Sequence, residues 1–300
     1  MNSFSINRFG RTLRWLQNTN FRMMLAWFVG MVLLVFMGEM IAYSLMKGLD
    51  PDCMIRRIAD MGTAVMYISS LAMISCFVLS IRDKRKRVGF LMLPSSNLEK
   101  YLSLVIYASV IWICCIFLAM VVGDSLRMTW FWVRDIYGYT YEGLSRAVMI
   151  NGELVYWYSS ALPRLLDNLN PFPTYSSEYY SIDTLFLVMK YVIVSSFLLW
   201  MHSLYTLGGT LLRKYAFVTT SLLFILCLVL FIKSMHYFEL NMFQIHHEQG
   251  HAFSGEIGTV AYVLAVLLPL LSAFNYWASY RIFKGFQLIT NKWLNYDFHK

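Results

Sequence analysis

The long apolar segments constrain this chain more than any other feature of its sequence. Six segments are apolar over about 20 residues, the length that an α-helix needs to cross the hydrocarbon core of a bilayer. Only 14% of the 300 residues are charged, against roughly 25% in a typical soluble domain. We therefore predict an all-α polytopic membrane protein, a single membrane domain over residues 1–300. Its six transmembrane helices are expected near residues 23–46, 62–81, 101–123, 185–209, 216–236 and 257–280.

Basic residues are concentrated on one side of these predicted spans. Loops on the opposite side carry fewer cations, and acidic residues are mixed among them. Because cytoplasmic segments accumulate Lys and Arg, both termini are predicted to be cytoplasmic. The same rule accounts for the net charge of +8 without a nucleic-acid partner. The basic residues on the predicted cytoplasmic side are Arg8, Arg11, Arg14, Arg22, Arg82, Lys84, Arg85, Lys86, Arg87, Lys100, Arg213, Lys214, Arg281, Lys284, Lys292 and Lys300.

The residues before the first span have a helical pattern of their own. Over residues 3–20, apolar side chains recur on one helical face and arginines lie roughly opposite. This pattern predicts an amphipathic interfacial helix on the inner leaflet. The alternative is a basic leader that only orients the first span. The apolar face consists of Ile6, Phe9, Leu13 and Leu16, and the basic face of Arg8, Arg11 and Arg14.

The longest segment on the predicted outer side covers residues 124–184 and is rich in Tyr and Trp. Aromatic side chains of this kind are typical of the headgroup level of a bilayer, so short interfacial helices are expected here.

Two polar side chains within the spans are candidates for function. Glu39 lies in the outer part of the first span, where a carboxyl group indicates a functional role or a protonated or paired glutamate near the interface. Asn275 lies in the last span, and we expect it to bond a neighbouring helix rather than a substrate.

One motif resembles a catalytic site. His247-Glu248-Gln249-Gly250-His251 matches H-E-x-x-H, in which two histidines one helical turn apart bind zinc and the glutamate activates water. Gly250 lowers helix propensity within the motif, and no third ligand is signalled. We interpret the segment as an outer loop with solvated histidines, with a membrane zinc metalloprotease that uses His247 and His251 as an alternative. The chain also lacks a phosphate-binding loop, so any ATPase must be another polypeptide.

Two blocks of sequence resemble a known family. Residues 90–102 read Phe-Leu-Met-Leu-Pro-Ser-Ser-Asn-Leu-Glu-Lys-Tyr-Leu, after a basic loop. Residues 202–210 read His-Ser-Leu-Tyr-Thr-Leu-Gly-Gly-Thr, and Arg-Lys-Tyr-Ala-Phe follows at 213–217. These blocks resemble bacterial ABC-transporter permease-like proteins of the type-2 exporter class. The predicted six spans agree with that family's layout, but the largest outer segment of this chain follows the third span, whereas the re-entrant helices of the family lie between the fifth and sixth spans.

The resemblance implies a function and partners. The chain would be the permease subunit of an ATP-driven exporter in the inner membrane, with no enzymatic activity and no cofactor of its own. A separate ABC ATPase would bind ATP and Mg, and a second permease half, identical or paralogous, would complete the transporter. Residues 82–100 would form a cytoplasmic coupling segment that contacts the ATPase through Arg85, Arg87, Phe90 and Leu93. The alternative is a non-catalytic membrane sensor or assembly module whose outer segment binds a partner.

Overall fold

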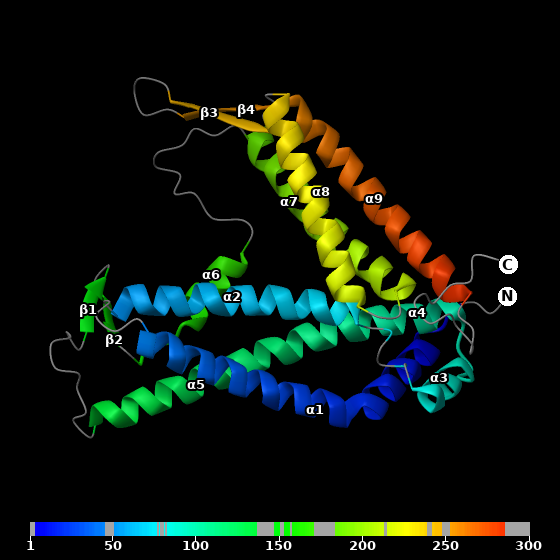
Figure 1. Ribbon diagram of the computed structural model, residues 1–300, viewed down its shortest axis with the longest axis horizontal. Coiled ribbons are helices and arrows are strands. Elements are labelled where there is room, and N and C mark those ends of the chain that lie inside the picture. Colours follow the sequence, from blue (N-terminus) through cyan, green and yellow to red (C-terminus); the bar gives the residue numbers. More distant parts are fainter. Residues whose placement is uncertain are drawn as a thin grey trace. The chain divides into compact units, whose positions relative to one another are not determined.

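The computed structural model is mainly helical and describes most of the chain (Figure 1). Six of its helical stretches are long and apolar enough to cross a membrane, which confirms the number predicted from the sequence and is compatible with a multi-pass membrane protein. They are Ile6–Leu45, Pro51–Ser75, Asn97–Arg134, Leu185–Leu211, Ala216–Tyr237 and Thr259–Lys284. The described residues are 4–45, 51–76, 78, 81, 83–136, 147–150, 153–156, 158–170, 184–212, 215–238, 242–247 and 253–285.

The chain divides into two compact units, each described here by itself. The first unit comprises residues 1–16, 71–108 and 172–300. The second unit comprises residues 17–70 and 109–171.

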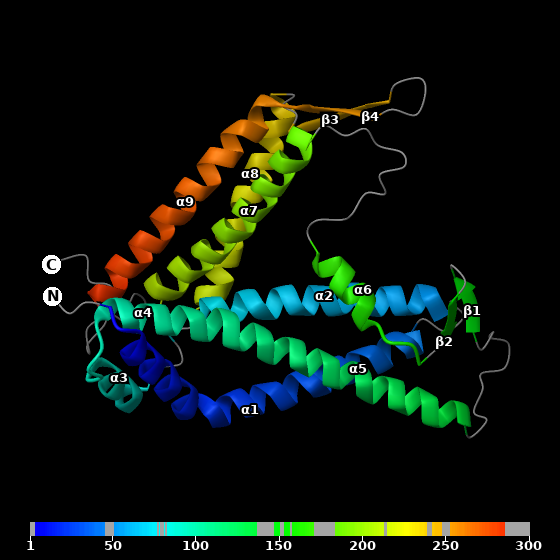
Figure 2. The ribbon, with the colours of Figure 1, turned by 180° about the vertical axis from the view of Figure 1, so that it is seen from behind.

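Three helices lie side by side in the first unit: α7 (Thr184–Leu211), α8 (Ala216–Tyr237) and α9 (Thr259–Lys284) (Figures 1 and 2). The lack of a side chain at Gly208 lets α7 approach α8 closely, because a Cβ atom there would overlap Thr220. Close approach through small residues is how helices commonly associate in membranes, where the hydrophobic effect does not drive their packing.

An antiparallel hairpin lies at one end of these helices. It pairs β3 (Phe243–His247) with β4 (Phe253–Ile257), and the ring of Phe243 lies 5.0 Å from that of Phe186 at the start of α7. A second hairpin in the other unit pairs β1 (Ala147–Ile150) with β2 (Glu153–Tyr156). The prediction of an all-α chain is therefore wrong for these two short regions.

The first helix differs from its prediction. α1 (Ile6–Leu45) is one continuous helix, so the expected interfacial helix and the first span are not separate elements. Its N-terminal part buries Thr12 and Leu16, while Ile6, assigned to the apolar face, is 75% exposed. Arg11 is exposed, as expected for the polar face.

The first unit also contains two short helices between the second and third predicted spans. α3 (Lys84–Leu91) is followed by α4 (Asn97–Ile106). A π-helical turn, η2 (Tyr107–Ile111), leads from α4 into α5 (Trp112–Ile136).

In the second unit, α2 (Pro51–Ser75) and α5 extend beyond their predicted spans. Residues 51–61 and 124–136, predicted to lie in outer segments, are parts of α2 and α5, so 124–136 continues the third predicted span and is not a separate interfacial helix. α6 (Leu162–Leu169) lies beside α2 in both views (Figures 1 and 2), and a Cβ atom at Gly62 of α2 would lie 2.9 Å from Leu165 of α6. Part of the long outer segment thus folds against the helices of its own unit.

Candidate functional site

The predicted coupling segment folds as a capped helix followed by a tight turn. Asp83 is the N-cap of α3 and accepts a hydrogen bond from the backbone N–H of Arg85 at 3.3 Å. A capping box begins α4: Ser96 and Glu99 have the spacing Ser-x-x-Glu, the Glu99 N–H donates to Ser96 Oγ and the Ser96 N–H donates to Glu99 Oε2. Local sequence alone therefore accounts for where both helices begin.

α3 contacts α1 through Phe90 and α4 through Leu91. The ring of Phe90 is fully buried and lies 5.9 Å from that of Trp15 in α1. Gly89 allows this approach, because a Cβ atom there would lie 3.2 Å from the Trp15 ring. Next to Phe90, at the C-terminus of α3, Lys100 Nζ of α4 donates to the carbonyl of Leu91 at 2.7 Å, one of the carbonyls that a helix C-terminus leaves without a partner.

Glu99 joins the N-terminal part of α1 to α4. Its side chain is 0% exposed and accepts from the backbone N–H of Ser5 at 2.7 Å and of Ser96 at 2.8 Å. Arg8 adds an ion pair, with Nη2 at 3.0 Å from Oε1. Charge-assisted bonds of this kind are the stronger class of hydrogen bond, so this buried carboxylate is fully satisfied by the protein itself.

The four predicted ATPase contacts are not equally accessible. Arg85 is exposed and Leu93 is half-buried, whereas Arg87 and Phe90 are buried. Met92, which the sequence analysis did not single out, is 80% exposed. A partner that approached α3 would therefore meet Arg85 and Met92 first, while Phe90 holds the helix in place.

The second unit contains a buried cluster of charges around Glu39. Arg127 and Asp124, one turn apart on α5, are 0% and 2% exposed. Arg127 donates to Asp124 Oδ1 from Nη2 at 2.6 Å and from Nε at 3.1 Å. Glu39 Oε2 of α1 also lies 3.1 Å from Arg127 Nε, but this oxygen makes no hydrogen bond. The cluster therefore holds two carboxylates and one guanidinium group.

The same cluster fixes the polypeptide that precedes α6. Asp124 accepts from the hydroxyl of Ser160 at 2.6 Å and from the N–H of Ala161 at 3.2 Å. Arg127 Nη2 donates to the carbonyl of Ser159 at 2.7 Å. The sequence analysis missed this role because it placed Asp124 and Arg127 in the outer segment 124–184, where it expected only short interfacial helices. The available signal was their opposite charge at a spacing of three residues, next to an apolar helix.

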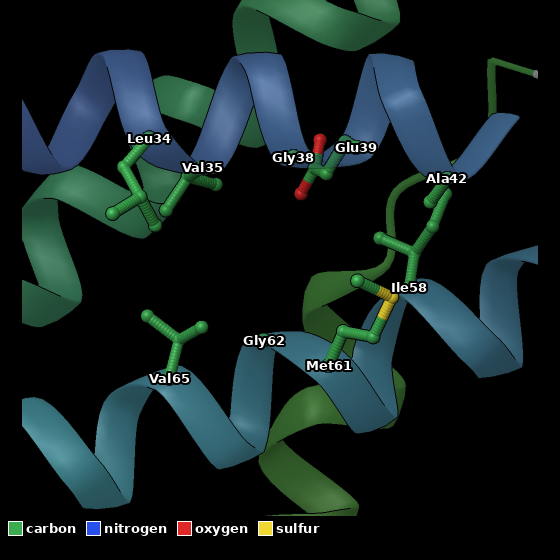
Figure 3. Close-up of a pocket in the computed structure, with 9 residues that line it drawn as sticks. All are labelled: Leu34, Val35, Gly38, Glu39, Ala42, Ile58, Met61, Gly62 and Val65. Carbon is green, nitrogen blue, oxygen red and sulfur yellow. The ribbon is translucent and has the colours of Figure 1, made fainter. Parts of the chain in front are cut away.

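Glu39 also lines a cavity between α1 and α2 (Figure 3). The cavity has a volume of about 50 Å³, and Glu39 is the only ionisable residue among the nine that line it. Val35 from α1 and Val65 from α2 point into the gap. On another side of Glu39, a cavity of about 10 Å³ is lined by both Glu39 and Asp124. The carboxylate therefore lies where small polar groups have room to bind.

The other intramembrane candidate, Asn275, joins two helices. Its Nδ2 donates to Ser203 Oγ of α7 at 3.1 Å. One turn further along α9, Ser279 Oγ accepts from Tyr101 of α4 and from Thr210 of α7, both at 3.1 Å. These contacts assign Asn275 to helix packing, the usual role of such residues in membrane bundles.

The zinc-like motif is not placed on a helix where the structure describes it. His247 ends strand β3, and Glu248 to His251 lie outside the described residues. Among the described residues, no group of three or more His, Cys, Asp or Glu side chains is placed to hold a metal ion.

Comparison with known protein families, with curated proteins and with solved structures gives no match to this chain.

Proposed function

We propose that this chain is the membrane-spanning permease subunit of an ABC exporter in the bacterial inner membrane. A separate ATPase would supply ATP hydrolysis, and a second permease half would complete the transport path. The two sequence blocks and the six apolar helices support the proposal. The single observation on which it depends most is the short helix α3, capped on its own and inserted between two spans.

The charge of α3 favours a role outside the fold. Lys84, Arg85, Lys86 and Arg87 begin the helix, at the end where the helix dipole already places positive charge. Cations there oppose helix formation by about 0.3–1 kcal/mol each, so they are not present to stabilise α3. Arg85, which is exposed, suits a negatively charged surface, and the acidic rim of a groove on an ATPase is one such surface.

The contacts of α3 could transmit a displacement of this helix by the ATPase to the membrane-spanning helices. The Phe90–Trp15 contact passes displacement of α3 to α1, and the Lys100–Leu91 bond passes it to α4. The Arg8–Glu99 ion pair makes α1 and α4 move together at this end. Because α4 continues through η2 into α5, motion of α3 would tilt one long helical stretch.

Co-purification tests the proposal. The tagged chain, isolated from membranes of its own cells, is expected to retain an ABC ATPase in equal amount. Combining Arg85→Glu with Met92→Asp reverses the charge and removes the apolar contact on the exposed face of α3, so bound ATPase should fall at least about tenfold. Arg14→Glu, an equal charge reversal on the exposed face of α1, should retain it.

A third variant separates docking from transmission. Phe90→Ala empties the contact with Trp15 but leaves the exposed face of α3 unchanged, so the ATPase should stay bound while export stops. Absence of any ATPase from the native preparation would reject the proposal.

A second candidate is a sensor or assembly module. The observation in its favour is that Asp124 and Arg127 hold residues 159–161 rigidly, which would suit a binding surface in the outer segment. Recovery of an outer-segment partner with no ATPase would select this function.

A further inference from the structure

The charged cluster of the second unit holds two carboxylates, Glu39 and Asp124, around the single guanidinium group of Arg127. Asp124 accepts four hydrogen bonds, two from Arg127, one from Ser160 and one from Ala161. Asp124 and Arg127 therefore form a complete, neutral pair. Glu39 shares this guanidinium group, with its Oε2 at 3.1 Å from Arg127 Nε, and its side chain is 12% exposed.

Other cations among the described residues of this unit are engaged or exposed. Arg164 and Arg56 both pair with Asp52, and Arg57 is exposed. None of the three lines the cavity beside Glu39. A negative charge in apolar surroundings is costly unless a cation or a hydrogen-bond donor reaches it.

A cationic group could reach Glu39 through the cavity between α1 and α2. Eight of its nine lining residues carry no charge. Leu34 of α1 and Met61 of α2, 51% and 48% exposed, lie at its rim. If α1 and α2 cross a bilayer, this rim faces the hydrocarbon chains of the lipids.

We infer that the cavity binds the headgroup of a primary alkylammonium amphiphile. The ammonium group donates to Glu39, and the alkyl chain leaves between Leu34 and Met61 into the membrane. A neutral amphiphile of the same length lacks the charge-assisted bond to Glu39, and an anionic one is repelled. This site is independent of any ATPase partner.

Photolabelling in nanodiscs of phosphatidylcholine tests the inference. The probes are a dodecylamine and a dodecanol that carry the same diazirine on the chain, and the readout is label on peptides that contain Leu34 or Met61. The amine should label them about tenfold more than the alcohol. An α8 peptide around Leu226, apolar and 55% exposed, provides the reference for non-specific contact.

Two variants complete the experiment. Glu39→Gln should lower the amine-to-alcohol ratio to that of the α8 peptide. Val65→Phe fills the cavity and leaves Glu39 in place, so label from both probes should fall at Leu34 and Met61. Equal labelling by both probes in the native protein overturns the inference, as does a ratio that persists in Glu39→Gln or label that Val65→Phe leaves unchanged.

Discussion

The two units each contain a glutamate in apolar surroundings, and the surroundings of the two carboxylates differ. The side chain of Glu99 is 0% exposed and that of Glu39 is 12% exposed. Glu99 in the first unit accepts from two backbone N–H groups and from Arg8, and it is completely enclosed. Glu39 in the second unit lies near Arg127, but that guanidinium group is already engaged by Asp124 and Ser159. Glu99 therefore has a structural role, because it joins α1 to α4. Glu39 lines a cavity, where we propose that it binds a ligand.

The two carboxylates differ because their hydrogen-bond donors come from different parts of the chain. The donors to Glu99 are backbone groups that helix starts leave without partners, so the sequence pattern Ser-x-x-Glu provides one of them locally. The donors of the Glu39 cluster come from a distant helix and from the chain before α6. Substitutions that remove individual donors should therefore have effects of different size in the two units.

The largest effect is expected for Arg127→Ala. It leaves Asp124 and Glu39 close together, buried and without a cation, which should lower the free energy of unfolding by about 3–5 kcal/mol. Unfolding in detergent micelles, followed by tryptophan fluorescence, measures this loss. Arg57→Ala, at an exposed position, is the matched control and should change stability by less than about 0.5 kcal/mol. Equal stability of the two variants would show that the cluster does not hold this unit together.

The next effect is expected for Glu99→Ala. The backbone N–H groups of Ser5 and Ser96 lose their acceptor, and a loss of about 2–3 kcal/mol follows. Release of the N-terminus should also speed cleavage by trypsin at Arg11 and Arg14. Arg8→Ala leaves both backbone bonds to Glu99 intact, and Arg8 is 31% exposed, so its loss should stay near 1 kcal/mol. A larger loss for Arg8→Ala than for Glu99→Ala would mean that the ion pair, not the cap, holds α1 to α4.

A smaller effect is expected for Ser160→Ala. It removes the hydrogen bond from the Ser160 hydroxyl to Asp124 and the acceptor of the Leu162 N–H, which should destabilise the protein by about 1–2 kcal/mol in the same unfolding assay. Ser125→Ala is the control, because the Ser125 hydroxyl is exposed and bonds only the carbonyl of Val121 in its own helix. Indistinguishable variants would mean that Arg127 and the hydrogen bond from Ala161 to Asp124 anchor residues 159–161 without the Ser160 hydroxyl.

The sequence predicted the features that depend on local pattern. The fifth span was predicted at 216–236, and the helix is observed at Ala216–Tyr237. The agreement is close because an uninterrupted apolar run determines both ends of the helix. The capping box at Ser96 and Glu99 is likewise a local pattern, because Ser-x-x-Glu before an apolar run is enough to specify it. Asn151-Gly152, between the strands β1 and β2, is a turn signal that the prediction overlooked.

The features that depend on distant contacts were not predictable in the same way. Trp15 lies off the apolar face of its own helix and contacts Phe90 of α3. Asp124 and Arg127 were placed in the outer segment after the third predicted span, because a buried charged pair needs partners that hydropathy does not reveal. The tertiary contacts with Glu39 and with residues 159–161 decide that this part of α5 is buried.

The smallest effect is expected for Glu39→Gln, and this variant tests the comparison most directly. Glu39 Oε2 makes no hydrogen bond, and the Asp124–Arg127 pair stays complete without it. Loss of attraction to Arg127 is offset because one uncompensated charge no longer has to be buried, so stability should change by less than about 0.5 kcal/mol. Glu99→Gln should lose about 2 kcal/mol in the same assay, since an amide cannot replace a carboxylate that accepts from three groups at once. If Glu39→Gln lost as much as Glu99→Gln, Glu39 would be a structural partner of Arg127 and no longer a candidate for binding a ligand.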